Sequence, residues 1–143
     1  MNTALQILNK RDDRRIWSIK PDATVYEAIA EMDKRSVGAL LVMDEDRLFG
    51  IISERDYTRK IVLKQKSSRT TKVSDIMTQN VYCVQKEESI DKCMRIMHEH
   101  AFRHLPILDG ETVIGMLTVK DVLGILLCEK DELIHQLENY INS

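Results

Sequence analysis

Two short phrases of the chain carry the same pattern of residues that could hold a sugar or a phosphate. "GIISERD" at residues 50–56 and "GMLTVKD" at residues 115–121 each contain a glycine, two apolar residues, a hydroxyl residue, two variable positions and an aspartate. A carboxylate accepts hydrogen bonds from two donors at once, so it suits a vicinal diol such as the ribose 2′- and 3′-hydroxyls. A hydroxyl beside the N–H groups of a helix start suits phosphate. The candidate ligand residues are Ser53, Asp56, Thr118 and Asp121.

The same residues also suit a purely structural role. A Ser or Thr between a strand and a helix can cap the helix, and an acid three residues later resembles a capping box. Aspartate is one methylene shorter than the Glu or Gln that a capping box favours, so it could direct its oxygens outward instead. The glycine of the phrase either permits close packing or lets a flat ring approach the strand. The residues alone leave both roles open.

The two phrases belong to a longer internal repeat. Residues 16–62 align without gaps on residues 81–127 at an offset of 65 residues. Apolar residues match apolar residues at most positions, so the pattern is repeated more than the letters. The five identical pairs are Met32 and Met97, Leu40 and Leu105, Asp44 and Asp109, Gly50 and Gly115, and Asp56 and Asp121.

Each copy predicts the order β-α-β-β-α. Short alternating or apolar stretches predict a first strand at residues 16–19 and 81–84. Thr24, with Glu27 three residues on, and Ser89 are predicted N-caps of helices whose apolar residues recur at helical spacing. The other strands are predicted at residues 39–43, 48–52, 105–108 and 113–117, and the second helices at residues 54–63 and 119–127.

The fold class is therefore α/β, with two pseudo-symmetric β-α-β-β-α repeats and short N- and C-terminal helices. Each half alone has too few strands and too little core, so we expect the halves to pack sheet to sheet. The apolar stripe of the C-terminal helix packs either on its own core or on a partner subunit. The predicted divisions are an N-terminal helix at 1–11, repeats at 12–63 and 73–128, a polar basic linker at 64–72, and a C-terminal helix at 129–143.

Composition excludes several classes of protein. Hydrophobic residues make up 43% and charged residues 31% of the 143 residues, as in a globular chain. No apolar run approaches the roughly 20 residues of a membrane span, and the N-terminus has no signal-peptide pattern. A net charge of −2 gives no global attraction to nucleic acid or anionic lipid. Three widely spaced cysteines predict reduced thiols and a cytoplasmic location.

Catalytic and metal-binding patterns are weak. His98 and His100 point in different directions on a helix and spacing fixes no third ligand, so solvated histidines are favoured over a metal site. Asp56 lies at helical spacing from Arg59 and Lys60, which predicts an ion pair. No Walker loop, nucleophile elbow, HExxH or CxxC pattern occurs in the sequence. We therefore expect no enzyme activity, no catalytic residue and no metal site.

The doubled unit resembles a tandem pair of CBS domains, a family named after cystathionine β-synthase. The stretches that carry the resemblance are the two phrases, "DIMTQNVYCVQKEESI" at 75–90 and "FRHLPIL" at 102–108, and the likeness runs over residues 12–127. The resemblance implies a fold called a Bateman module, in a stand-alone protein of bacterial type. It also implies an adenosine ligand such as AMP, ATP, NAD or S-adenosylmethionine, bound between the halves.

In such pairs the aspartate typically holds the ribose, and the preceding Ser or Thr lies near ribose or phosphate. The resemblance implies that Ser53 acts with Asp56, and Thr118 with Asp121. Adenine in the family lies against strands of the opposite repeat. For the Asp121 site the implied adenine contacts are Ile19, Lys20, Val37, Gly38 and Ala39, and for the Asp56 site they are Val84, Gln85, Phe102, Arg103 and His104. The candidates for phosphate are Arg55, Lys120, Arg103 and His104.

The two sites should differ. Arg103 and His104 align with Gly38 and Ala39, so charge is unequal where a phosphate would lie. One site should prefer a more phosphorylated ligand or stay empty.

The function predicted is a regulatory adenine-nucleotide sensor that acts through conformational change or dimer geometry. The alternative is a ligand-independent dimerisation or protein-interaction module, in which the phrases only cap helices. The predicted partners are an adenine nucleotide, a second copy of the chain and a protein target in trans. The apolar residues of the second helices that would form contacts or core are Ile61, Val62, Val122, Ile125 and Leu126.

Overall fold

The computed structural model describes residues 2–10 and 16–142, and these divide into two compact units. The first-repeat unit contains the described residues up to Tyr82 from 16 onward, together with residues 111–114. The second-repeat unit contains residues 2–10, 83–110 and 115–142. The predicted boundary between residues 11 and 12 lies outside the described residues.

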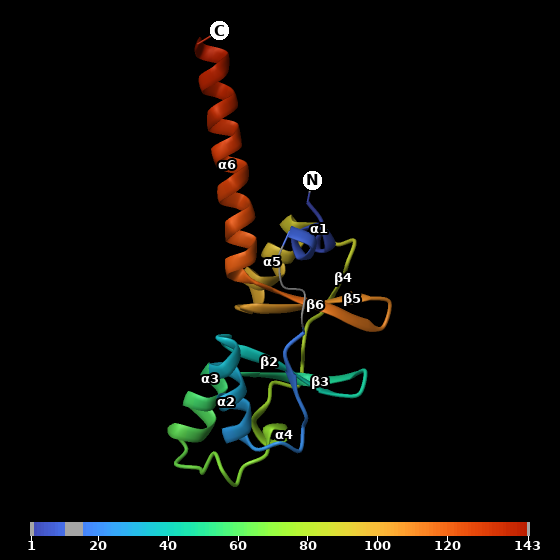
Figure 1. The fold of residues 1–143 in the computed structure, drawn as a ribbon, viewed down its shortest axis with the longest axis vertical. Helices are drawn as coiled ribbons and strands as arrows, with labels where there is room; N and C mark the ends of the chain where they lie inside the picture. The colour runs from blue at the N-terminus through green and yellow to red at the C-terminus, as the bar shows by residue number, and fades with distance from the viewer. Residues whose placement is uncertain (1, 11–15, 143) are drawn as a thin grey trace. The chain divides into compact units, whose positions relative to one another are not determined.

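The two units share the predicted order of elements (Figure 1). The first-repeat unit contains β1 (Ser18–Ile19), α2 (Val25–Arg35), β2 (Ala39–Asp44), β3 (Arg47–Ser53), α3 (Glu54–Tyr57), the π-helical turn η1 (Thr58–Val62) and α4 (Val73–Ile76). The second-repeat unit contains α1 (Ala4–Lys10), β4 (Val84–Gln85), α5 (Ile90–His100), β5 (His104–Asp109), α6 (Val119–Asn142) and, from residue 115 onward, β6 (Thr112–Thr118). The predicted α/β class with a repeated β-α-β-β-α unit is confirmed.

Each repeat builds a three-stranded sheet, with the orders β1-β2-β3 and β4-β5-β6. β1 runs parallel to β2 and pairs Ile19 with Val42, whereas β2 and β3 form an antiparallel hairpin. β4 likewise runs parallel to β5 and pairs Val84 with Ile107. The turns after β2 and β5 each contain a residue with positive φ, Glu45 at 54° and Gly110 at 64°.

The predicted helix caps are present in both units. The Thr24 hydroxyl accepts a hydrogen bond from the Glu27 amide over 3.1 Å, and the Ser89 hydroxyl accepts one from the Lys92 amide over 3.2 Å. These side chains satisfy first-turn N–H groups that would otherwise lack a partner. The local signals read from the sequence therefore set where α2 and α5 begin.

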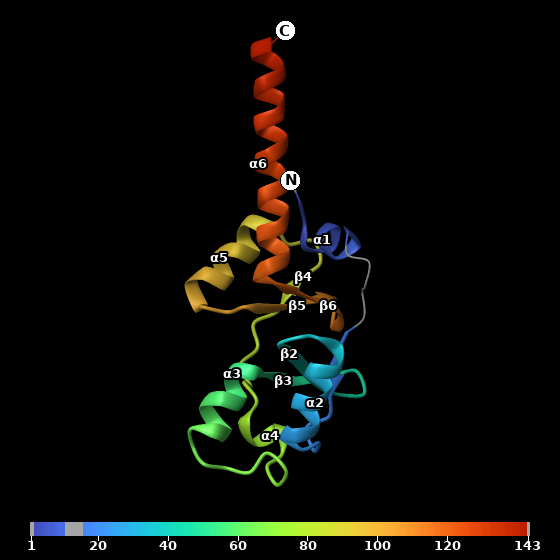
Figure 2. The same ribbon diagram turned by 60° about the vertical axis from the view of Figure 1, so that its left-hand side comes forward.

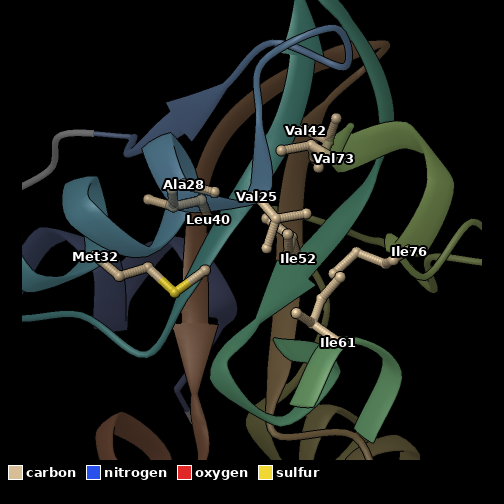
Figure 3. Close-up of a cluster of buried hydrophobic side chains, with 9 residues drawn as sticks. All are labelled: Val25, Ala28, Met32, Leu40, Val42, Ile52, Ile61, Val73 and Ile76. Carbon is tan, nitrogen blue, oxygen red and sulfur yellow. The ribbon is translucent and has the colours of Figure 1, made fainter. Parts of the chain in front are cut away.

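The core of the first-repeat unit joins α2, the sheet and α4 (Figure 3). α2 contributes Val25, Ala28 and Met32, whose spacing places them on one face of the helix. β2 is buried over residues 39–42, as expected of a central strand. The whole cluster consists of Val25, Ala28, Met32, Leu40, Val42, Ile52, Ile61, Val73 and Ile76.

The helix that precedes each repeat packs on the other repeat. α4 follows the first repeat in the chain and docks on it, because the amides of Val73 and Ser74 donate to the carbonyls of Ala23 and Pro21 over 2.8 and 3.0 Å. α1 makes the matching bonds in the second-repeat unit, where Ala4 donates to Glu88 over 2.8 Å. Residue 73 begins the predicted second repeat, and the contacts of α4 place this helix in the core of the first-repeat unit.

The C-terminal end of the second repeat differs from the prediction. The sequence predicted separate helices at residues 119–127 and from residue 129, but α6 is one helix of 24 residues. Residues 125–134 contain neither glycine nor proline, so nothing ends the helix there. Beyond Leu126 all of the described side chains of α6 are exposed, and Figures 1 and 2 show this end extending past α1 and α5. Among the described residues no helix is both long and apolar enough to cross a membrane.

Candidate functional site

The first phrase closes a reciprocal capping box. Ser53 ends β3 in an extended conformation, and its hydroxyl accepts a hydrogen bond from the Asp56 amide over 3.2 Å. In return the Ser53 amide donates to Asp56 Oδ2 over 3.0 Å, and the Ser53 hydroxyl lies 3.1 Å from the same oxygen. Asp56 is buried, with 9% of its surface exposed.

The second phrase has the same geometry at the start of α6. The Asp121 amide donates to the Thr118 hydroxyl over 3.2 Å, and the Thr118 amide donates to Asp121 Oδ2 over 2.9 Å. The alternative in which the shorter aspartate turns both oxygens outward is wrong. The cap amide needs an acceptor, and aspartate reaches it despite its length. One oxygen of each carboxylate thus has a fixed structural role.

The other oxygen of Asp56 contacts a lysine and a threonine. Lys60 Nζ lies 3.2 Å from Asp56 Oδ1, and the Thr78 hydroxyl lies 3.4 Å from it. This confirms the ion pair predicted from helical spacing, with Lys60 rather than Arg59 as the partner shown. Thr78 is not among the predicted site residues, because it reaches Asp56 from 22 residues further along the chain and no local pattern signals such a contact.

The glycine of each phrase serves close packing. A Cβ atom on Gly50 would stand 2.5 Å from the Thr78 carbonyl oxygen, and one on Gly115 would stand 2.8 Å from Leu8 Cδ1. Both distances are shorter than real Cβ contacts allow. The segment after α4 fills the space at Gly50, and α1 fills the space at Gly115. These are the segments that dock on the first and the second repeat, respectively. Of the two roles left open for the glycines, the structure shows close packing.

The phrase of each unit lies beside the first residues of the middle strand of the same unit. The Val119 amide donates to the Arg103 carbonyl over 3.1 Å, and the Glu54 amide donates to the Gly38 carbonyl over 3.1 Å. Phe102, Arg103 and His104 therefore adjoin the Thr118 phrase. Residues 37–39 adjoin the Ser53 phrase in the same way.

His104 connects this strand electrostatically to Asp121. Burial lowers the pKa of His104 below its usual 6.5, the positive charge of Arg103 lowers it further, and the negative charge of Asp121 opposes both effects. His104 is therefore mostly neutral at pH 7 in the unliganded chain. The Phe102 ring stacks on His100, with ring centroids 5.2 Å apart.

Other predicted ligand residues lie further from the phrase of their own unit. Val84 and Gln85 pair with Ile107 and Leu108, three or more residues along β5 from His104, a separation of about 10 Å at the usual rise of a strand. The Gln85 side chain binds both backbone groups of Gly110 in the following turn. Ile19 pairs with Val42, at the same position in its sheet. The side chains of Lys20, Arg55 and Lys120 are exposed.

Metal-binding side chains are not gathered in the described residues, where no group of three or more His, Cys, Asp or Glu is placed to hold an ion.

Comparison with known proteins identifies the repeated unit. The family model described as "CBS domain" matches residues 4–63 and 73–128. The CBS domain-containing protein CBSX3, mitochondrial, of Arabidopsis thaliana is 37% identical over 135 residues, which cover 91% of this chain and 65% of that protein. Inosine-5′-monophosphate dehydrogenase of Methanocaldococcus jannaschii is 35% identical over 124 residues, but the match covers only 24% of its length.

Solved structures agree with this assignment. A protein with CBS domains from Burkholderia ambifaria MC40-6 is 43% identical, with a TM-score of 0.86 over 89% of this chain and 95% of that one. The CBS domain pair of protein MJ0100, solved with methylthioadenosine and S-adenosylmethionine, has a TM-score of 0.78 over 90% of this chain and 98% of its own at 22% identity, which shows the fold. The chain belongs to the CBS-domain family and carries two copies of that domain.

Proposed function

We propose that the chain is a non-catalytic regulatory module that binds an adenine nucleotide or a related adenosine ligand. The observation that carries the proposal is the grouping around the start of α6, where the Thr118–Asp121 pair adjoins Arg103 and His104. A carboxylate beside a hydroxyl suits a ribose, and basic side chains beside a helix N-terminus suit a phosphate. The MJ0100 pair shows that this fold can hold an adenosine ligand.

Each residue has a distinct part in the proposal. The capping bond fixes the orientation of the Asp121 carboxylate, so little side-chain entropy is lost when a ribose binds. Arg103 and the exposed Lys120 supply positive charge for a phosphate. The adenine contacts implied by the family resemblance stay predictions, as does a cytoplasmic location. A ligand would regulate by its differential affinity for two conformations.

A thermal-shift panel tests the proposal. The full chain is melted with AMP, ATP, NAD and S-adenosylmethionine in turn. A ligand at 100 times its Kd should add about 2.7 kcal/mol, which raises Tm by roughly 3–6 °C in a chain of this size. Asp121→Ala should abolish the shift, whereas Asp131→Ala, an exposed acid on the same helix, should retain it. Unchanged melting with every ligand would contradict the proposal.

A second candidate function, homodimerisation or protein interaction without a ligand, is favoured by the surface of α6. Its exposed apolar residues follow a heptad spacing, the pattern by which helices pair with each other, with Lys130 at the one heptad position of the stripe that is not apolar. They are Leu123, Leu127, Ile134, Leu137 and Ile141, flanked by Leu133 and Tyr140. The acids of the helix lie between these positions, so a second copy of α6 matches the stripe without burying acid against acid.

Sedimentation equilibrium tests this second function. Ile134→Glu, in the middle of the stripe, should convert a dimer to monomer, since it would bury a charge in the helix pair. Asn139→Glu adds the same charge on the polar face of α6 and should leave the dimer intact. A wild-type monomer at all concentrations would remove this candidate.

A further inference from the structure

We propose that two copies of α6 pair side by side in the same direction, and that Lys130 fixes this parallel orientation. The inference rests on the second candidate function, the homodimer, and adds to it how the two chains are aligned. It is carried by the position of Lys130 in the apolar stripe, by the acid that follows it, and by the face of α6 that its own unit covers.

The apolar stripe of α6 is exposed from its first residue to its last. Leu123 is 52% exposed and Ile141 is 79% exposed. The contacts of α6 with its own unit lie on another face, where Val122 is buried and Asn2 donates through Nδ2 to Glu129 Oε1 over 2.6 Å. Val122 and Glu129 are one heptad apart, so they share a face, and that face is turned away from the stripe. A second helix can therefore lie along the stripe without displacing these contacts.

The stripe contains one charged position. Its members recur after four, three, four, three and four residues, and all except the third are apolar. They are Leu123, Leu127, Lys130, Ile134, Leu137 and Ile141. This spacing reads the same in both directions, so the spacing alone permits a parallel and an antiparallel pair. Lys130 is the residue that distinguishes the two.

A parallel pair confines the charge to one layer. Each residue of the stripe then faces the same residue of the second copy, so Lys130 faces the partner's Lys130 and the other layers are apolar on both sides. In an antiparallel pair Lys130 of each chain would face the partner's Ile134, which places an ammonium against an apolar side chain in two layers. Such layers lose apolar burial and desolvate a charge. In the parallel pair the long lysine side chains extend from the shared layer into solvent.

Asp131 supplies an anion for the lysine in the parallel pair only. In that pair the residue that follows each Lys130 borders the layer of the partner's lysine, so each ammonium extends toward the partner's Asp131. In an antiparallel pair Asp131 would instead face the partner's Asp131, on the edge of the pair away from both lysines. The ion pairs are exposed to solvent and add little stability, but their sign favours one orientation over the other.

The orientation decides where the second phrases of a dimer lie. Leu123 comes two residues after Asp121 and faces the partner's Leu123 in a parallel pair, which brings the two second phrases to the same end of the helices. The 24 residues of α6 span about 36 Å. An antiparallel pair would separate the two phrases by most of that length.

Disulfide trapping tests the orientation. Leu127→Cys and Leu137→Cys are each made in the full chain with Cys128→Ser, because Cys128 is exposed on the same helix. In a glutathione redox buffer each variant alone should form a disulfide-linked dimer, since a parallel pair places each new thiol opposite its own copy. Asn139→Cys, on the polar face of α6, should stay unlinked. An antiparallel pair would link only the mixture of Leu127→Cys and Leu137→Cys, which would overturn the inference.

Lys130→Leu tests the cause of the orientation. It makes every layer of the stripe apolar, so it should tighten the dimer by roughly tenfold or more in sedimentation equilibrium. It should also admit the disulfide between positions 127 and 137 when the two cysteine variants are mixed. Asn139→Leu adds the same side chain on the polar face and should have neither effect. Links between identical positions only, in the Lys130→Leu chain, would overturn the role of Lys130.

The outcomes separate the inference from the homodimer on which it rests. A dimer that links only in the mixture of variants overturns the parallel orientation and leaves homodimerisation through α6 standing. A dimer that links in no variant places the contact away from α6 and overturns the inference. A wild-type monomer at all concentrations removes both the homodimer and the inference.

Discussion

Leu8 occupies the space that a side chain on Gly115 would need. Its Cδ1 atom lies 2.8 Å from the position of a Cβ atom on that glycine, so α1 rests directly on β6. The matching glycine of the first repeat, Gly50, faces the Thr78 carbonyl oxygen at 2.5 Å. Gly115 is thus opposed by the tip of a flexible side chain, whereas Gly50 is opposed by backbone.

This difference predicts unequal effects of alanine at the two glycines. Gly115→Ala should lower the free energy of unfolding by about 1 kcal/mol, because Leu8 can change rotamer. Gly50→Ala should lower it by an amount on the order of 2–3 kcal/mol, because the backbone of Thr78 must move away from β3. Urea unfolding monitored by circular dichroism measures both. Leu8→Ala combined with Gly115→Ala should cost less than the sum of the single changes. Equal costs for the two glycine variants would contradict the distinction.

Removal of either phrase aspartate should destabilise the unliganded chain, by different amounts. Asp121→Ala removes an acceptor for the Thr118 amide and should cost about 1 kcal/mol. Asp56→Ala removes a buried carboxylate that accepts from the Ser53 amide and hydroxyl and pairs with Lys60, and should lower the free energy of unfolding by an amount on the order of 1–3 kcal/mol. Thermal melting without ligand measures the difference, with Asp131→Ala as the exposed control. A larger loss for Asp121→Ala than for Asp56→Ala would refute this order.

The stability of the second-repeat unit should fall in mild acid because of His104. Its pKa in the folded chain is below 6.5, chiefly through burial, with Arg103 adding to the effect and Asp121 opposing it. The folded state therefore binds fewer protons than the unfolded state below that pH. The stabilisation is fully present above pH 6.5 and is lost as the pH falls through the folded value. The difference between the urea midpoints at pH 7.5 and pH 5.5 should be smaller in His104→Gln than in the unaltered chain. The exposed control His135→Gln should keep the difference of the unaltered chain.

The cysteines should differ sharply in reactivity. Burial raises the pKa of Cys93 to about 11, assisted by the charge of Glu88, so at pH 8 only about one molecule in a thousand carries the thiolate. Cys128 is exposed on α6. An aromatic disulfide reagent at pH 8 should give a fast phase that Cys128→Ser removes. Cys93 should react only after unfolding in guanidinium, and fast labelling of Cys93 in the native chain would contradict the structure.

Local signals in the sequence predicted the repeated unit well. Helices α2 and α5 begin where Thr24 and Ser89 were expected to cap them, because a cap bonds to an amide three residues away. β2, β3, β5 and β6 match the predicted strands to within one residue at each end, since alternation and turn residues are also local. The ion pair of Asp56 and Lys60 followed from helical spacing alone.

Contacts between distant segments could not be read in the same way. The docking of α1 and α4, and the reach of Thr78 to Asp56, depend on hydrogen bonds whose partners are many residues apart. The orientation of Asp56 and Asp121 was left open because the length of the side chain decides nothing until the backbone of the cap is placed. The π-helical turn η1 has no sequence signature, since packing selects it over a regular helix.

The exchange of α1 and α4 between the repeats has a consequence for any attempt to produce half of this protein. A fragment cut at the family boundary after residue 63 would lack Val73 and Ile76, which complete its apolar interior. A fragment that starts at residue 73 would keep α4, whose contacts lie in the missing half, and would lose the covering helix α1. Each fragment would therefore lack the helix that covers it and carry the helix that covers the other half.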